Sequence, residues 1–258
     1  MSNTALITGA WAGLGAAFAR YHASRKGDVI LVARRADALQ ALKQEVEQAH
    51  GITAHVFARD LAADGGAEAL YADTREAGLR VDILINNAGF GGHGAHLDRD
   101  LAAEQAMIDL NVRALMTLTR LYAQDMVAQG GGRILNVSST ASFMPGPLQA
   151  VYFATKAFVT SYSQAVDHEL RARNVTCTAL APGYVETEFA AVADLEGTRL
   201  VSGGGASAES AARHGYDAMM QGKLVTVNET GLGFLVNWVI PFLPRRQVLK
   251  MVARMQAK

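Results

Sequence analysis

The stretch Thr4-Ala-Leu-Ile-Thr-Gly-Ala-Trp-Ala-Gly-Leu-Gly15 joins a short apolar run to a turn that contains three glycines. Residues 4–8 have the composition of a buried strand, and the apolar periodicity after the turn indicates a helix to about Ser24. Glycines in a strand-to-helix turn let the backbone approach a phosphate, and the helix N-terminus adds N–H donors and a positive dipole end. The stretch therefore predicts a phosphate-binding turn at the start of an α/β fold.

The glycine spacing, Gly9, Gly13 and Gly15, is G-x-x-x-G-x-G, which differs from the G-x-G-x-x-G pattern of many dinucleotide-binding turns. A glycine-rich turn can also be ordinary loop chemistry. The position of the turn, directly after the first strand of a chain in which strands and helices alternate, favours a dinucleotide.

Apolar strands alternating with helices predict a parallel sheet covered on both faces, and right-handed crossovers make it doubly wound. We expect a single α/β domain of the Rossmann type, with a doubly wound parallel seven-stranded sheet and helices on both faces. Residues 1–230 would form the dinucleotide-binding and catalytic domain, and residues 231–258 a C-terminal basic amphipathic extension of the same domain. Besides 4–8, strands are expected at 29–33, 53–58, 81–85, 132–137, 175–181 and 223–227, and later helices near 37–50, 65–77, 100–128, 152–173 and 208–220.

Composition narrows the class of protein. The chain has 258 residues with 24 basic and 24 acidic side chains, and a formal charge of zero argues against a nucleic-acid partner. Cys177 is the single cysteine, so we expect neither an intrachain disulfide nor a cysteine metal cluster. The N-terminus enters a strand at once, and the apolar run 232–243 is too short to cross a bilayer. We therefore expect a cytoplasmic protein without a metal.

The C-terminal segment is basic. From Gly231 onward it contains no acidic residue. Apolar residues lie along one side of its predicted helix, and such a helix can rest on an anionic membrane surface. Packing against the body of the protein or against a second subunit is the commoner explanation. The basic residues are Arg245, Arg246, Lys250, Arg254 and Lys258.

Tyr152 and Lys156 are four residues apart on a predicted helix, which places both on one face. An ammonium beside a phenol is expected to lower the phenol's pKa from its usual value of about 10 towards working pH. Such a phenol is a general acid or base for a carbonyl or hydroxyl substrate. The pair also occurs on idle helix faces, so its meaning depends on the rest of the chain.

The end of the second strand indicates which dinucleotide is preferred. An acidic residue there would bind a ribose 2′-hydroxyl, but this chain has Arg34 and Arg35. A guanidinium suits a 2′-phosphate, whereas a carboxylate would repel it. The alternative is a solvated arginine pair at the start of a helix. The sequence therefore predicts NADP in preference to NAD.

Together these motifs resemble those of the short-chain dehydrogenases/reductases, over nearly the whole chain. The segment 8–15 is similar to the family's cofactor turn, Asp60-Leu61 to its adenine-contacting pair, and Asn86-Asn87-Ala88-Gly89 to its fourth-strand motif. The segment 182–187 resembles the part that closes over the nicotinamide. Members preferring NADP often have a basic residue in the turn where this chain has Trp11, so the preference rests on the arginines. The resemblance implies cofactor contacts from Gly9, Trp11, Gly13, Leu14, Gly15, Arg34, Arg35, Asp60, Leu61, Asn87, Ala88, Gly89, Tyr152, Lys156, Pro182, Val185 and Thr187.

The resemblance implies hydride transfer between nicotinamide and a carbonyl or secondary alcohol, with Tyr152 as the general acid/base. Lys156 would keep the phenol acidic and bind the nicotinamide ribose. Ser139, thirteen residues before Tyr152, would hold the carbonyl oxygen. Ser138 competes for this role, but adjacent strand residues point to opposite sides, and the spacing favours Ser139. Asn111 would hold a water that links Lys156 to solvent, although it can also be a plain polar helix residue.

The substrate is expected to be a small carbonyl or alcohol compound, lipophilic ones included, and the sequence does not identify it. His93 or His96 could touch it, although a solvated loop is the simpler interpretation. Residues 189–205, rich in alanine and glycine, suit a lid. A homodimer or homotetramer is expected, with the long helices beside the fifth strand as its interface. The substrate side is expected to include Phe143, Met144, Leu148 and Gln149.

Two alternatives remain. A sugar-nucleotide epimerase or dehydratase has the same fold, but the chain is short for the larger substrate domain of such enzymes. A nucleotide-sensing protein that has lost catalysis would not need the trio of Ser139, Tyr152 and Lys156.

Overall fold

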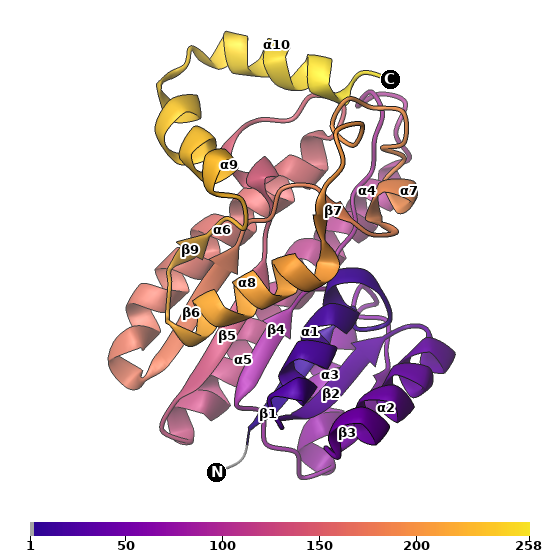
Figure 1. Ribbon diagram of the computed structural model, residues 1–258, viewed down its shortest axis with the longest axis vertical. Helices are drawn as coiled ribbons and strands as arrows, with labels where there is room; N and C mark the ends of the chain where they lie inside the picture. The colour runs from indigo at the N-terminus through magenta and orange to yellow at the C-terminus, as the bar shows by residue number, and fades with distance from the viewer. Residues whose placement is uncertain (1–2) are drawn as a thin grey trace.

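The central sheet has seven parallel strands in the order β3-β2-β1-β4-β5-β6-β9 (Figure 1). The computed structural model describes residues 3–258. The predicted doubly wound, seven-stranded parallel sheet is thereby confirmed. The last strand is shorter than expected, since only two residues of the predicted 223–227 pair with β6. The strands are β1 (Thr4–Thr8), β2 (Asp28–Ala33), β3 (Ala54–Ala58), β4 (Ile83–Asn86), β5 (Gly132–Val137), β6 (Val175–Leu180) and β9 (Val225–Thr226).

Helices cover both faces of the sheet (Figure 1). On one face α1 (Gly13–Ser24), α2 (Ala36–His50) and α8 (Ala208–Met220) pack on alternate residues of β1 and β2. On the other face α3 (Gly66–Glu76) and α5 (Leu115–Ala128) pack on the residues between them, and α6 (Ala150–Leu170) reaches the same cluster. In β1, for example, Ile7 joins the first cluster and Leu6 the second. This two-sided burial explains why the strands are continuous apolar runs.

The helix expected over 100–128 is interrupted. It consists of α4 (Leu101–Ile108), a π-helical segment η1 (Asp109–Ala114) and α5. Asp100 caps α4, because its carboxylate accepts a hydrogen bond from the Ala102 N–H. A π turn adds one residue per turn, and such turns occur often at functional sites. Here the π turn contains Asn111.

The segment between β6 and α8 is more ordered than a simple loop. It contains β7 (Val185–Glu186), α7 (Phe189–Val192) and β8 (Ala206–Ser207), and β7 pairs with β8 in parallel. Ala190, Ala193 and Leu195 are buried in a small cluster of their own. The region predicted as a lid therefore has a short helix and an apolar core.

The C-terminal residues form a layer above the carboxyl ends of the strands (Figure 1). Val248 and Val252 of α10 are buried in the same apolar cluster as Tyr152 and Phe153. No helix within residues 3–258 has both the length and the apolar character that crossing a membrane requires. The elements are α9 (Thr230–Phe234), a π-helical η4 (Leu235–Val239), a 3-10 turn η5 (Ile240–Phe242) and α10 (Arg245–Gln256).

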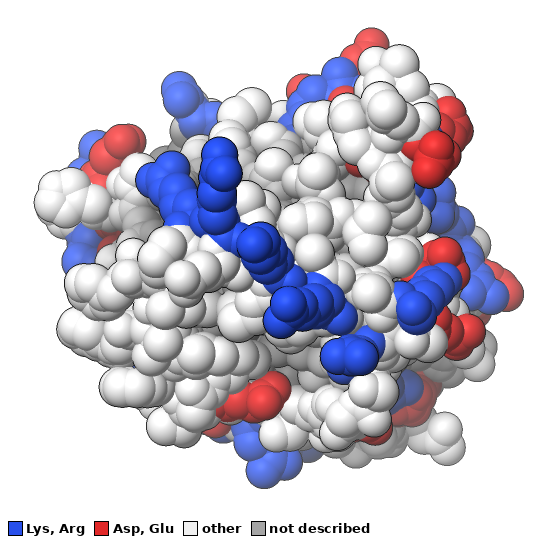
Figure 2. All heavy atoms as spheres, turned by 90° about the horizontal axis from the view of Figure 1, so that it is seen from above, with Lys and Arg blue, Asp and Glu red and all other residues white. Residues whose placement is uncertain are grey.

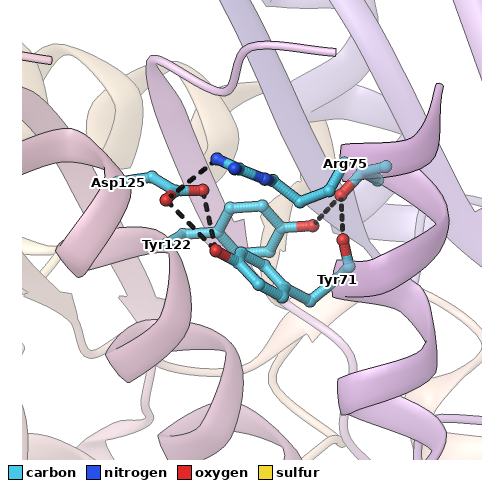
Figure 3. A network of polar contacts seen from close by, with 5 residues as sticks. Tyr71, Arg75, Tyr122 and Asp125 are labelled. Carbon is cyan, nitrogen blue, oxygen red and sulfur yellow. Dashed lines mark hydrogen bonds and ion pairs between the residues drawn. The ribbon is translucent and has the colours of Figure 1, made fainter. Parts of the chain in front are cut away.

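A polar network joins α3 to α5 on one side of the sheet (Figure 3). The Tyr122 hydroxyl, fully buried, lies 2.8 Å from Thr74 Oγ1. The Tyr71 hydroxyl donates to the Asp125 carboxylate at 3.0 Å, and Arg75 pairs with the same carboxylate at 3.2 Å. Burial raises the pKa of Tyr122, so its phenol stays protonated. The network thus satisfies the polar groups that two packed helices bury between them.

We predict that Tyr122→Phe lowers the free energy of unfolding by about 1 kcal/mol, because it removes one buried hydrogen bond and keeps the ring. Tyr122→Ala should cost about 3–5 kcal/mol, because it also leaves a cavity. Urea unfolding followed by circular dichroism measures both. Equal losses of stability in the two variants would contradict this account, since they would show that burial of the ring does not contribute to stability.

Candidate active site

The glycine turn has the conformation that a diphosphate requires. Gly9 and Gly13 have φ values of +66° and +52°, in the left-handed region that favours glycine. A Cβ atom on Gly15 would collide with the Gly9 carbonyl oxygen. The residue before α1 is Ala12, whose side chain cannot cap the helix, so the first N–H groups are left for another acceptor. These residues fit the diphosphate of a dinucleotide.

Thr8 and Asn87 hold the turn in place. The Thr8 hydroxyl accepts hydrogen bonds from the backbone N–H groups of Asn87, at 3.0 Å, and Ala88, at 2.9 Å. The Asn87 amide donates in return to the carbonyl oxygens of Thr8, at 2.9 Å, and Gly9, at 3.3 Å. The end of β4 is thereby locked to the end of β1, and Asn87 serves the turn as a clamp.

Arg34 and Arg35 lie at the carboxyl end of β2, beside the glycine turn. The Arg35 guanidinium sits over the Trp11 ring, 4.4 Å from its centroid, so Trp11 and Arg35 form a cation–π pair. Arg34 is largely exposed and is 3.9 Å from the Asp60 carboxylate. Asp60 itself accepts a hydrogen bond from Ala62, at 3.0 Å. One guanidinium is therefore held flat against the turn, and the other remains accessible to a ligand.

The segment after β6, residues 182–187, reaches the glycine turn. The side chain of Thr187 lies directly against Gly13. The carbonyl oxygen of Pro182 accepts a hydrogen bond from the Thr140 N–H at 2.9 Å, which ties this segment to the loop after β5. Val185 packs against the apolar cluster beneath α1. Leu14 packs there too, and Leu61 is buried on the opposite face of the sheet.

Tyr152 lies in the first turn of α6 and is almost fully buried. Phe153 and Phe189 pack on its ring, with centroid distances of 6.2 and 5.5 Å. Burial raises its pKa to about 12, and a hydrogen bond with the Ser139 hydroxyl acts weakly in the opposite direction. This direction is the reverse of the one predicted from the spacing, because desolvation of the phenol outweighs the nearby ammonium.

Lys156 is buried beneath Tyr152. Its Nζ donates to the Val137 carbonyl oxygen at 2.9 Å and lies 5.8 Å from the centre of the Tyr152 ring. Burial lowers its pKa to about 8. The two side chains share one helical face, as expected, but the ammonium is directed to the end of β5. This geometry explains its small influence on the phenol.

The structure separates the two candidate serines. The Ser138 hydroxyl donates to the Lys156 carbonyl oxygen at 3.0 Å and lies 2.6 Å from Thr160 Oγ1, so it packs against α6. Ser139 begins the turn η2 (Thr140–Phe143), where its hydroxyl accepts a hydrogen bond from the Ala141 N–H at 3.1 Å. Of the two, only Ser139 reaches the phenol of Tyr152.

Asn111 is buried and connects the π turn to the loop after β4. Its carbonyl oxygen accepts from the Phe90 N–H at 3.1 Å, and its amide donates to the Phe90 carbonyl at 2.9 Å and to Thr155 Oγ1 at 3.1 Å. A Cβ on Gly89 would lie 2.9 Å from the Asn111 oxygen and 3.5 Å from Lys156 Nζ. Asn111, Gly89 and Lys156 therefore meet at one point. Glycine is needed there because a side chain would fill the space.

Apolar side chains surround Tyr152, and several of these side chains belong to the C-terminal layer. Of the four residues expected on the substrate side, Met144 joins the cluster around Tyr152, while Phe143 and Leu148 are half-buried. Gln149 is buried and donates to Gln256 Oε1 of α10 at 2.7 Å. The apolar side chains that accompany Tyr152 include Phe90, Phe189, Ile240, Val248 and Val252.

The two loop histidines have different surroundings. His93 Nε2 lies 2.7 Å from the Gln256 carbonyl oxygen, so His93 ties the loop after β4 to α10. His96 is exposed, in agreement with the solvated-loop interpretation. Across residues 3–258, no group of three or more His, Cys, Asp or Glu side chains is arranged to hold a metal ion.

Sequence reasoning missed what the Thr8 hydroxyl does, and it missed Gln256. Thr8 was placed at the end of the first strand and in the segment similar to the family's cofactor turn, but its hydroxyl was given no role. A hydroxyl next to a glycine turn is a signal that it accepts hydrogen bonds. Gln256 follows the apolar stripe of α10, since it is four residues after Val252. That spacing would place it on the buried face, but no local pattern indicates what it meets there.

A model of the short chain dehydrogenase family matches residues 3–196. Sulfoacetaldehyde reductase 2 of Chromohalobacter salexigens is 35% identical over 194 residues, which cover 74% of this chain and 76% of that protein. Human 17-beta-hydroxysteroid dehydrogenase type 3 is 32% identical over 191 residues, 72% of this chain and 60% of that protein. A short-chain dehydrogenase from Sphingobium yanoikuyae, solved in complex with NADPH, has a TM-score of 0.84 at 30% identity and covers 90% of each chain. The fold and these matches agree that the chain belongs to the short-chain dehydrogenase family of oxidoreductases.

Proposed function

We propose that this protein is an NADP(H)-dependent oxidoreductase that interconverts a lipophilic carbonyl compound and its secondary alcohol, with Tyr152 as the general acid/base. The observation that carries the proposal is the buried phenol of Tyr152, whose pKa the Ser139 hydroxyl influences and whose ring centre lies 5.8 Å from Lys156 Nζ. When bound, the nicotinamide cofactor supplies or accepts the hydride.

In the reductive direction the carbonyl oxygen gains a proton as the hydride reaches its carbon. Tyr152 is the group placed to donate that proton, and Ser139 donates a hydrogen bond to the same oxygen as negative charge develops. A phenol whose pKa is raised to about 12 is fully protonated at neutral pH. The resting form of the site is therefore the proton donor, which favours reduction over oxidation.

Lys156 is the source from which Tyr152 recovers its proton. Its pKa of about 8 is close to neutral pH, so it can lose and regain a proton, whereas an ordinary lysine would hold it. Asn111 acts as a positioning residue, since it holds Phe90 and Thr155 beside Lys156. The predicted water next to Asn111 would extend this path to solvent.

The cofactor preference rests on Arg34 and Arg35. Arg34 is accessible after the end of β2, and the Arg35 guanidinium lies over the ring of Trp11 in the glycine turn. These two residues would hold the adenosine end of the cofactor. Two cations there suit a 2′-phosphate. The NADPH complex of the Sphingobium yanoikuyae relative is consistent with this choice.

The apolar cluster around Tyr152 supports a lipophilic substrate. Met144, Phe189 and Ile240 offer no charge with which to bind an anionic group beside the phenol. Sulfoacetaldehyde reductase 2 and the human hydroxysteroid dehydrogenase differ in the substrates that their names give, and the steroid agrees better with an apolar lining. Residues 231–258 contribute to this lining, which supports treating them as an extension of the catalytic domain.

We also propose a homodimer or homotetramer that assembles through α5 and α6. Met116 on α5 and Phe158 on α6 are apolar and exposed, and Phe158 stacks on Tyr162 at an interplanar angle of 12°. Exposed apolar residues on two neighbouring helices are typical of a subunit interface.

Tyr152→Phe should lower kcat for ketone reduction by at least about 1000-fold, because it removes the proton donor and keeps the ring. The dissociation constant for NADPH, measured by fluorescence, should change less than about threefold. Tyr162→Phe, on the same helix, is the matched control and should retain activity. Unchanged turnover in Tyr152→Phe would remove Tyr152 from the mechanism, and NADPH binding without turnover of any ketone by the native protein would favour a sensor.

The rate of reduction should fall as pH rises through about 8, since Lys156 loses its proton there. Below that pH the ammonium is present and the rate should be level, until other groups titrate. Initial rates with saturating NADPH from about pH 6 to about pH 10 give the profile. A level profile across this range would show that the charge of Lys156 does not matter.

Arg34→Asp should lower the ratio of kcat/KM for NADPH to that for NADH by at least about tenfold, because the carboxylate would repel a 2′-phosphate. Arg173→Asp, exposed and distant from the glycine turn, is the control for surface charge. If the ratio moved equally in both variants, or in neither, Arg34 would not select the cofactor.

A further inference from the structure

Three aromatic side chains form an exposed stripe on the C-terminal layer. Phe234, Trp238 and Phe242 are four residues apart and are 64, 67 and 79% exposed. Two of the residues between them, Val236 and Ile240, are buried on the opposite side of the segment. Aromatic residues of this size are seldom left in water on a segment whose other face is buried. The stripe therefore has the character of a contact surface.

The stripe leads directly into a helix with a basic outer face. Val248, Val252 and Gln256 of α10 are buried, and the cations occupy its exposed side. Figure 2 shows a row of Lys and Arg side chains crossing the face of the molecule above α10, next to an area with few charges. Of the five cations of this segment, Lys258 forms an ion pair, with Asp194. The structure of residues 3–258 shows no ion pair for the other four, which are Arg245, Arg246, Lys250 and Arg254.

A shallow groove of about 360 Å³ runs along the same helix. Three cations, Arg199, Lys250 and Arg254, line it together with two methionines and Gln247, and its lining contains no acidic side chain. Such a groove can accept the phosphate of a lipid headgroup, because guanidinium and ammonium groups bind phosphate and the methionines are apolar.

We infer that the face formed by the aromatic stripe and the outer side of α10 binds the surface of an anionic phospholipid bilayer. Tryptophan and phenylalanine are favoured at the boundary between headgroups and acyl chains, and arginine and lysine bind the anionic headgroups beside them. This contact is in the plane of the membrane, so it needs no spanning helix. It goes beyond the proposed enzymatic activity and does not depend on it.

The alternatives fit less well. A second copy of the chain would bring the same cations to a two-fold contact, where like charges repel. A nucleic acid would satisfy the cations, but an aromatic stripe on a helical segment offers no groove that follows a strand. A bilayer would contact both parts of the surface, since its acyl chains would cover the aromatic stripe and its anionic headgroups would bind the cations of α10. Its contact would lie on the opposite side of α10 from Tyr152, so α10 would stand between the lipid and the substrate side.

Sedimentation of the full-length protein with vesicles tests the inference. We expect binding to vesicles of phosphatidylcholine mixed with phosphatidylglycerol, at least about tenfold tighter than to phosphatidylcholine alone, and weaker in high salt. Arg245→Gln/Arg246→Gln should bind about 30-fold more weakly, because each cation near an anionic surface contributes a similar share of the binding and this variant removes two of them. Arg120→Gln/Arg173→Gln, also exposed and basic, is the control and should bind within about twofold of the native protein.

Trp238→Ser/Phe242→Ser tests the aromatic stripe and should lose at least about tenfold in affinity for the anionic vesicles. Leu224→Ser, an exposed apolar residue outside the C-terminal layer and outside the proposed subunit interface, is its control. Trp11→Phe leaves Trp238 as the single tryptophan, whose emission should shift to the blue on adding anionic vesicles and be quenched by brominated acyl chains. No sedimentation with anionic vesicles would overturn the inference. So would equal losses in the control variants, or an unquenched Trp238 together with a particle mass by light scattering that falls in Trp238→Ser/Phe242→Ser, because the stripe would then join two copies.

Discussion

The hydrogen bonds between Thr8 and the end of β4 are the constraint from which the site follows. β1 lies between β2 and β4, at the point where the strand order reverses and a crevice opens above the carboxyl ends. The Thr8 hydroxyl accepts from two consecutive N–H groups of the segment after β4, and Asn87 returns two bonds to the glycine turn. The turn and the loop after β4 therefore move as one unit.

The consequences of this clamp extend to the residues that we propose as catalytic. Gly89 follows the clamped segment and lies against Asn111 and Lys156 without a side chain between them. Phe90, the next residue, is held by the Asn111 amide. The π turn is what presents that amide, because the extra residue in η1 rotates Asn111 into the core. One short loop thus joins the glycine turn to Asn111 and Lys156.

Burial dominates the electrostatics of the site. It raises the pKa of Tyr152 and lowers that of Lys156, so both side chains are driven towards their neutral forms. The phenol is then a donor in its resting state, and the amine can exchange a proton near neutral pH. The C-terminal layer contributes to this burial, since α10 buries Val248 and Val252 beside Tyr152 and turns its cations outward. α10 therefore excludes water from the surroundings of Tyr152 with one face and exposes its cations to solvent on the other.

The sequence by itself determined the parallel sheet, the glycine turn, the family and the grouping of Ser139, Tyr152 and Lys156. These features are local, because apolar periodicity, glycine positions and spacing along one helix do not depend on distant contacts. Only the tertiary structure decided what Asn111 holds and in which direction the pKa of Tyr152 moves. Each of these depends on groups brought together from far apart in the chain. The same holds for Gln149 and Gln256, 107 residues apart, whose buried hydrogen bond no sequence pattern indicates.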